Sequence, residues 1–309
     1  MSLLQKAAWH ASTMRIVSLL PSTTEILFAI GAGDHVVGVT FECDTPAEAR
    51  SRTIVSTTAL PEGLATAEID AFVTQAVRNG DDLYHLDADA LRGLDPDLVV
   101  TQDLCAVCAI DVDTVGAALD HLGCSADVVT IDPHTLAEVL DSLGTLGRAT
   151  GTEDRARALT TELGERLASV VRWVAGKPRP RTLLLEWTDP PFAPGHWVPE
   201  MVDLAGGHCV LGAPGEKSVR TTWDAVTASA PEVIVCAPCG YDLDGAAKEA
   251  ERLVADRVLP PDVPVWAVDA NAAYARPGPR LVDCIEVLSH VLHPGLRGVP
   301  DADQARRIR

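Results

Sequence analysis

The sequence predicts an α/β protein in which two lobes with parallel sheets flank one long helical connector. Short apolar runs alternate with segments of helical periodicity in both halves of the chain, which is typical of parallel sheets covered by helices. The length of 309 residues suits two domains of about 150 residues each. Between the halves, a proline-free stretch over 135–175 carries leucines and valines at helical spacing. We therefore expect a first lobe over 14–133, a connecting helix over 134–177, a second lobe over 178–295 and a polar tail over 296–309.

The first lobe opens with an apolar run over 15–20, which predicts a buried strand that ends at Pro21. Ser22 and Glu25 have the spacing of a capping box and predict that a helix starts there. The other elements predicted for this lobe are strands over 36–39, 97–101 and 126–131 and helices over 67–79 and 112–122.

The connector is expected to be one long helix that Gly144, Gly147 and Gly151 can bend or split. The second lobe repeats the alternation, with strands over 182–186, 233–235 and 265–268 and helices over 198–204, 223–229, 245–255 and 279–292. After Pro294 the chain is polar, and we expect a frayed tail. A stiff connector suggests two lobes that face each other across a cleft, and ligands of such sheets bind beyond the carboxyl ends of the strands.

The charge balance excludes several classes of partner. The chain carries 25 Lys and Arg against 44 Asp and Glu, a net charge of −19. This argues against binding to nucleic acids and to anionic membrane surfaces. No apolar run reaches about 18 residues, so we expect no membrane insertion. Lys6, His10 and Ser12 interrupt the apolar start that a secretory signal needs, so we expect a cytoplasmic protein.

Two pairs of cysteines are spaced as Cys-x-x-Cys. Cys105 and Cys108 follow one predicted strand, and Cys236 and Cys239 follow another. With Cys43, these thiols could ligate zinc or an iron–sulfur cluster between the lobes. A dithiol redox function and half-buried cysteines in tight loops are the alternatives, and the spacing leaves them open.

Aromatic residues gather after the first strand of the second lobe. Trp187, Phe192 and Trp197 lie among prolines and would form a rigid apolar wall for a large flat ligand. A hydrophobic plug of the lobe's own core is the alternative. His196 could ligate a metal or cap the next helix.

Polar residues at other strand ends complete the candidate ligand-binding set. Arg276 could hold a carboxylate, amide or phosphate oxygen, or it could form a structural ion pair. The backbone N–H groups after Pro21 could meet an anion or serve the helix alone. The remaining candidates are Ser22, Thr23, Thr24, Glu42, Gln102, Asp103, Glu186, Tyr241, Asn271 and Tyr274. No phosphate-binding loop, HExxH or GxSxG motif is present, so no catalytic residue is assigned and a ligand-binding protein is favoured over an enzyme.

Three segments, over 15–40, 186–207 and 271–288, resemble the cobalamin and iron-complex substrate-binding proteins of ABC importers. The resemblance extends over residues 14–294 and implies two Rossmann-like lobes joined by one long helix, the helical-backbone class of periplasmic-binding-protein-like folds. It also implies a corrinoid or iron chelate between the lobes, lined by the turn over 21–24, by Trp187, Phe192 and Trp197, and by the region near Arg276.

In that family, surface glutamates dock on the transporter, and Glu25 and Glu200 occupy plausible positions for this. A cytoplasmic protein would have no use for them, so a transporter partner is doubtful. The exported family members do not require the two cysteine pairs. We therefore expect a cytoplasmic protein that binds cobalamin or a related metal chelate, with a cysteine-ligated metalloprotein or metalloenzyme as the alternative.

Overall fold

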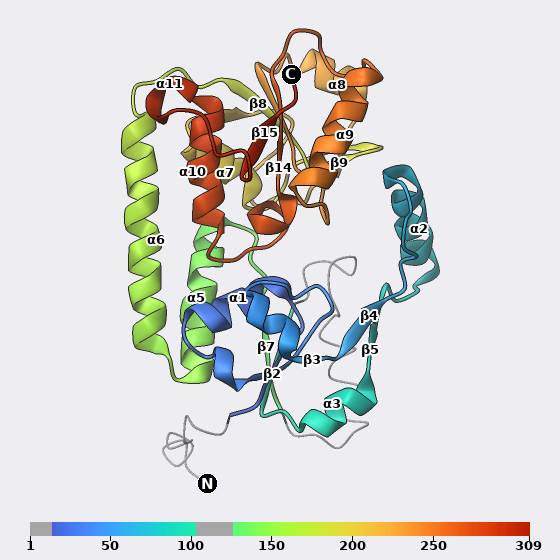
Figure 1. Cartoon of the computed structure of the whole chain (residues 1–309), viewed down its shortest axis with the longest axis vertical. Helices are drawn as coiled ribbons and strands as arrows, with labels where there is room; N and C mark the ends of the chain where they lie inside the picture. Colours follow the sequence, from blue (N-terminus) through green and yellow to red (C-terminus); the bar gives the residue numbers. More distant parts are fainter. Residues whose placement is uncertain (1–13, 103–125) are drawn as a thin grey trace. The chain divides into compact units, whose positions relative to one another are not determined.

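The computed structural model describes residues 14–102 and 126–309, and its chain forms two compact units (Figure 1). Unit 1 takes its described residues from Met1–Gly63, Ala71–Asp132 and Asp141–Thr160. Unit 2 consists of Leu64–Asp70, Pro133–Leu140 and Thr161–Arg309. The helix predicted over 112–122 lies outside the described residues.

Unit 1 is built on a parallel five-stranded sheet in the order β3-β2-β1-β6-β7. The central strands β1 and β6 are apolar runs buried along their whole length, as strands covered on both faces should be. The strands are β1 (Ile16–Ser18), β2 (Val36–Val39), β3 (Thr53–Ile54), β6 (Leu98–Thr101) and β7 (Asp127–Thr130). The four strands predicted for this lobe are confirmed, whereas the short exposed β3 was not predicted.

Helix α1 (Pro21–Ala29) begins two residues earlier than the capping box predicts. Its N-cap is Leu20, which makes no side-chain cap, and Pro21 is the first helical residue. Proline suits this position because its fixed φ is helical and its missing N–H would have no partner there. The capping-box prediction for Ser22 and Glu25 is therefore wrong, since both residues lie inside the helix.

An antiparallel pair of strands and further helical elements complete unit 1. The pair is β4 (Ser56–Thr58) and β5 (Tyr84–Leu86), with α2 (Thr66–Asn79) between them in sequence. Helix α3 (Ala88–Leu94) is capped by Asp87, whose carboxylate accepts a hydrogen bond from the Ala90 N–H. Two 3₁₀ turns are η1 (Gly33–His35) and η2 (Ala47–Ser51).

The predicted connector is two helices rather than one. Helix α5 (Leu136–Thr150) ends before Gly151, whose φ of 69° lies in the left-handed region, and α6 (Glu153–Val174) starts two residues later. A Cβ at Gly147 would lie 2.7 Å from the Ala156 Cβ, so glycine lets the two helices approach closely at this turn. Gly151 is one of the three positions at which the sequence permits a break.

Unit 2 contains a five-stranded sheet in the order β11-β8-β13-β14-β15. The strands are β8 (Arg181–Leu185), β11 (His208–Cys209), β13 (Val233–Cys236), β14 (Val265–Val268) and β15 (Ala305–Arg307). Alternate residues of β8 and β13 pack against α9 (Leu243–Ala255) in one core cluster, which includes Leu183 and Ile234. The strands predicted for this lobe are confirmed, and all pairings except β14–β15 are parallel.

The rest of unit 2 comprises short helices and a small antiparallel sheet. The helices are α7 (Val198–Leu204), α8 (Trp223–Ala228), α10 (Leu281–Leu292), α11 (Pro294–Arg297) and the π-helical turn η3 (Ala270–Tyr274). The small sheet has the order β12-β10-β9, formed by β9 (Trp187–Thr188), β10 (Pro191–Ala193) and β12 (Val219–Arg220).

The C-terminal residues do not fray. Strand β15 pairs antiparallel with β14 and forms the edge of the sheet. The Arg309 guanidinium donates hydrogen bonds to the carbonyls of Pro260, at 2.7 Å, and Val263, at 2.8 Å. The frayed-tail prediction is wrong because backbone pairing with β14 does not require an apolar sequence. Over the described ranges, none of the helices combines the length and the apolar character needed to span a bilayer.

Candidate ligand-binding site

The carboxyl edge of the unit 2 sheet gathers several of the predicted residues. Strand β8 is followed by Glu186 and Trp187, and the loop after β13 carries Tyr241. The rings of Trp187 and Tyr241 meet edge to face, with their centroids 5.9 Å apart. Both side chains are half-buried, so this aromatic pair is partly open to solvent.

Phe192 joins this aromatic group across a hairpin. It pairs with Trp187 in the β9–β10 register, so the two side chains lie on the same face of the hairpin. The Arg220 guanidinium from β12 lies over the Phe192 ring at 5.6 Å from its centroid. Trp187 and Phe192 therefore share one face of the hairpin, as the predicted aromatic wall requires, and Arg220 adds a cation that the sequence did not indicate.

Trp197 does not take part in an accessible wall. Its side chain is 4% exposed at the start of α7, so it belongs to the core of unit 2. For this residue the hydrophobic-plug alternative is correct.

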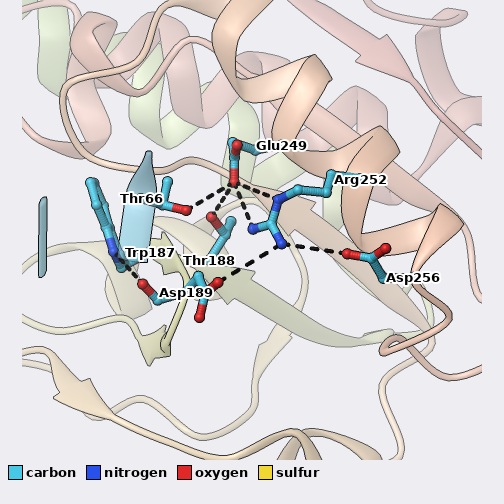
Figure 2. A network of polar contacts seen from close by, with 7 residues as sticks. All are labelled: Thr66, Trp187, Thr188, Asp189, Glu249, Arg252 and Asp256. Atoms are coloured by element: carbon cyan, nitrogen blue, oxygen red, sulfur yellow. Dashed lines mark hydrogen bonds and ion pairs between the residues drawn. The ribbon is translucent and has the colours of Figure 1, made fainter. Parts of the chain in front are cut away.

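The hairpin that carries Trp187 is fastened to α9 by one carboxylate (Figure 2). Glu249 accepts hydrogen bonds from the hydroxyl of Thr188, at 2.7 Å, and from Nη2 of Arg252, at 2.9 Å. The Thr66 hydroxyl, from the part of α2 that belongs to unit 2, is 3.4 Å from the same carboxylate oxygen. Thr188 is completely buried, so these contacts fix the hairpin beside its aromatic residues.

Arg252 extends this network toward the turn of the hairpin. Its Nη1 lies 4.0 Å from Asp189 and 3.5 Å from Asp256, and the Trp187 indole N–H donates to the Asp189 carbonyl at 3.1 Å (Figure 2). The sequence did not indicate Glu249 or Arg252, because they meet the hairpin only through contacts more than 60 residues apart in the chain.

Glu186 joins two loops at the base of this edge. One carboxylate oxygen accepts from the Gly195 N–H at 3.2 Å, and the other accepts from the Ser218 hydroxyl. Burial raises the pKa of Glu186 to about 7, although both hydrogen bonds oppose the shift. This predicted ligand residue is therefore a titratable support of the loops at neutral pH.

His196 lies against a second histidine. Its ring centroid is 5.7 Å from that of His134, which precedes α5, and 5.7 Å from that of Trp197. Both histidines belong to unit 2 and are half-buried. Burial, followed by His134 and Lys217, lowers the pKa of His196, so its imidazole is neutral at neutral pH. No periodicity or spacing pattern pointed to His134, which lies 62 residues before His196.

The residues after β14 mainly form hydrogen bonds within unit 2 rather than an accessible binding surface. Asp269 caps η3 by accepting from the Ala272 N–H at 3.2 Å, and Arg280 donates to the Asn271 carbonyl at 3.2 Å. Tyr274 is 4% exposed, so most of its side chain belongs to the core of unit 2. Asn271 and Arg276 are half-buried and stay candidates.

Tyr274 also lines a small cavity of about 130 Å³. Asp269, Arg280 and Cys284 are among the other residues around this cavity. Burial raises the pKa of Tyr274 well above its ordinary value.

The candidates of unit 1 form a closed polar cluster. The Ser18 hydroxyl is 2.8 Å from that of Thr23, the Thr24 hydroxyl donates to Ser18 at 2.8 Å, and the Cys43 thiol is 3.1 Å from Thr24. Thr23 and Thr24 are completely buried. These hydroxyls form hydrogen bonds with one another. We therefore expect them to stabilise the strand ends rather than to contact a ligand.

The other unit 1 candidates are less enclosed or not described. Ser22 is 4% and Gln102 6% exposed, whereas Glu42 is half-buried. Asp103 lies outside the described residues. The two glutamates that the resemblance assigns to docking are used by the fold: Glu25 is 5% exposed, and Glu200 accepts from the Leu136 N–H at 2.7 Å.

The described cysteines do not form a metal site. Cys236 is completely buried in β13, and burial, followed by Glu249, raises the pKa of its thiol to about 12, so it is protonated at neutral pH. Cys239 is exposed. Over residues 14–102 and 126–309, no group of three or more His, Cys, Asp or Glu side chains could hold a metal ion. Cys105 and Cys108 lie outside these ranges.

Sequence relatives connect the chain to known binding proteins. A cobalamin-binding protein from Halobacterium salinarum is 24% identical over 292 residues, covering 90% of this chain and 69% of that protein. An uncharacterized ABC transporter substrate-binding lipoprotein from Bacillus subtilis, YvrC, is 25% identical over 288 residues, covering 91% and 80%.

Solved structures share the fold. A periplasmic heme-binding protein from Pseudomonas aeruginosa has a TM-score of 0.72 and 19% identity, covering 95% of this chain and 97% of that one. The periplasmic vitamin B12-binding protein BtuF of Vibrio cholerae has a TM-score of 0.65 and 21% identity, covering 90% and 96%. The family described as periplasmic binding protein matches residues 16–259. This match extends over well more than half of the sequence, and the chain therefore belongs to the periplasmic binding protein family.

Proposed function

We propose that this protein binds a corrinoid, or a related metal chelate such as heme, at the carboxyl edge of the unit 2 sheet. The observation that carries the proposal is the aromatic group at the carboxyl edge of the unit 2 sheet, where Trp187 meets Tyr241 and pairs with Phe192. Half-buried aromatic side chains suit the flat apolar faces of a large ring. Relatives named as cobalamin-binding and solved structures named as vitamin B12- and heme-binding support the same ligand class.

The proposal is tested by titrating the purified full chain with cyanocobalamin, cobinamide and heme. We expect a spectral change and binding heat with at least one of them. The matched pair of variants is Trp187→Phe, which keeps an aromatic ring, and Trp187→Ala, which removes it. Trp173→Phe, on α6, is the control for the spectroscopic contribution of tryptophan. A chain that responds to none of the three compounds would reject the proposal.

A cysteine-ligated zinc or iron–sulfur protein is the second candidate, and it rests on the two Cys-x-x-Cys pairs. The complete burial of Cys236 within β13 disfavours it. Zinc, and iron together with acid-labile sulfide, are assayed on anaerobically purified protein and on the Cys236→Ser/Cys239→Ser variant. A cysteine-ligated site predicts metal that this variant loses, whereas metal that the variant retains is held elsewhere.

The cytoplasmic location stays a prediction, which cell fractionation with a tagged full-length chain would test. A transporter partner stays doubtful, since Glu25 is buried and Glu200 is bonded to the start of α5. We infer a carrier whose partner is a small molecule. Co-purification with an ABC transporter would contradict this inference.

A further inference from the structure

Two histidines of unit 2 lie in contact, and the chelate-binding proposal gives them no role. His134 precedes α5 and His196 precedes α7, so two separate loops bring them together. Their ring centroids are 5.7 Å apart and the planes are tilted by 54°.

Backbone contacts hold the His134 loop in place. The Glu138 carboxylate accepts from the His134 N–H at 2.6 Å and from the Thr135 N–H at 3.0 Å. The next N–H, that of Leu136, donates to Glu200 on α7 at 2.7 Å. Since His196 stands just before α7, this last bond ties the two histidine loops to each other.

His196 is held in a conformation that side chains seldom adopt. Its φ is 51°, in the left-handed region. Its N–H donates to the Glu216 carbonyl at 2.6 Å, and its carbonyl accepts from the Gly215 N–H at 2.9 Å. Such backbone strain persists only where the surroundings enforce it, and it is concentrated at functional sites.

The geometry of the pair suits a shared metal ion. An imidazole nitrogen lies about 2.0–2.1 Å from a bound ion, which puts the ring centre roughly 3.2 Å away, so two rings on one ion have centres at most about 6.4 Å apart. The observed 5.7 Å lies within this limit. Imidazole nitrogen is a good ligand for nickel, copper and zinc.

We propose that His134 and His196 together bind a divalent first-row transition-metal ion. No third His, Cys, Asp or Glu completes the set in the part of the chain that the structure describes. Water would fill the remaining positions, or the ion would bridge to an incoming molecule. The site needs no bound chelate, so it stands independently of the proposed function.

The experiment is a calorimetric titration of the metal-free full chain with Ni²⁺, a probe that does not oxidise thiols. The variants are His134→Asn and His196→Asn. Asparagine tolerates the left-handed conformation at position 196, so that substitution removes the imidazole without forcing the loop to rearrange. His208→Asn, on the exposed end of β11, is the matched control.

We expect one site in the wild type, a loss of affinity of at least about tenfold in either pair variant, and no change in the control. The double variant should bind Ni²⁺ no more weakly than the single variant with the lower affinity, because both histidines bind the same ion. Equal affinity in the wild type and in both pair variants would overturn the proposal.

A second measurement needs no variant. Diethyl pyrocarbonate modifies accessible imidazoles, and mass spectrometry locates the modified residues. Bound Ni²⁺ should protect His134 and His196 together while His208 stays reactive. Protection of neither histidine, or of only one, would overturn the proposal. Titration with cobalamin is run separately, so failure of the chelate proposal is distinguishable from failure of this one.

Discussion

The strand ends of the two units differ in chemistry although both belong to parallel sheets. In unit 1, the hydroxyls of Ser18, Thr23 and Thr24 and the Cys43 thiol are buried and bonded to one another. In unit 2, the half-buried rings of Trp187 and Tyr241 meet, and the titratable carboxylate of Glu186 immediately precedes Trp187 in the chain. A closed hydroxyl cluster fixes the backbone, whereas partly exposed rings leave surface for a ligand. Under the chelate-binding proposal, we therefore expect side chains of unit 2 to provide more of the ligand contacts than the described side chains of unit 1.

The largest expected effect is the pH dependence that Glu186 gives to the free energy of unfolding. Its pKa is raised from 4.5 to about 7 in the folded protein, so between these values the folded state holds a proton that the unfolded state has lost. This contribution is fully present below pH 4.5 and is lost as the pH rises to about 7, up to about 3 kcal/mol. Urea unfolding at several pH values measures it. Glu186→Gln should remove this part of the slope, and an unchanged slope would contradict the assignment.

The second-largest effect is expected from removing the Trp187 ring. Trp187→Ala is expected to weaken chelate binding by about 2 kcal/mol, or about thirtyfold, because tryptophans that a ligand covers are frequent hot spots. Trp187→Phe should retain most of the affinity. Calorimetric titration with the ligand that binds the wild type measures both. If Trp187→Ala bound as tightly as the wild type, the unit 2 edge would not be the ligand surface.

Substitutions of Glu249 test whether the hairpin that carries Trp187 depends on the hydrogen bonds of this carboxylate. Glu249→Ala leaves Thr188 and Arg252 without the acceptor that they share and should lower the free energy of unfolding by about 1–2 kcal/mol. Glu249→Gln keeps one acceptor oxygen and should recover part of this loss. Chemical unfolding measures stability, and the near-ultraviolet signal of Trp187 reports on the hairpin. Equal stability of the alanine variant and the wild type would remove Glu249 from this role.

The smallest effect is expected in unit 1. Thr24→Val replaces a completely buried hydroxyl that bonds Ser18 and the Cys43 thiol, and it should destabilise the protein by about 1 kcal/mol. Chelate affinity should stay unchanged, since the hydroxyl faces its own unit. Unfolding and ligand titration are measured on the same preparation. A loss of affinity larger than the loss of stability would reverse the comparison between the units.

Local sequence patterns predicted the helices and strands better than they predicted the contacts between distant residues. The buried runs of β1, β6 and β13, and of β8 after the exposed Arg181, are visible in sequence because strands covered on both faces are mostly apolar. The tail was misjudged because β15 is polar and is held by backbone pairing with β14. The start of α1 was misjudged because a capping box and a first-turn proline overlap at Pro21 and Ser22.

The candidate site was predicted in part. Trp187, Phe192, Tyr241 and Glu186 lie at the strand edge or on the hairpin beside it, as expected for residues that follow parallel strands. Trp197 and Tyr274 turned inward, because the same aromatic residues fill cores and line sites and only packing distinguishes the two. His134, Glu249 and Arg252 carry no local motif, so no reading of neighbouring residues could identify them.

By itself, the sequence determined the α/β class, the order of most strands and helices, and the segment that holds the aromatic residues, because hydrophobic periodicity and proline and glycine positions act over a few residues. Only the tertiary structure decided which side chains meet: that Glu249 fastens the Trp187 hairpin, that His196 lies against His134, and that the hydroxyls of unit 1 close on one another. These contacts join residues that are distant in the chain. They depend on how strands and helices pack, which no local pattern encodes.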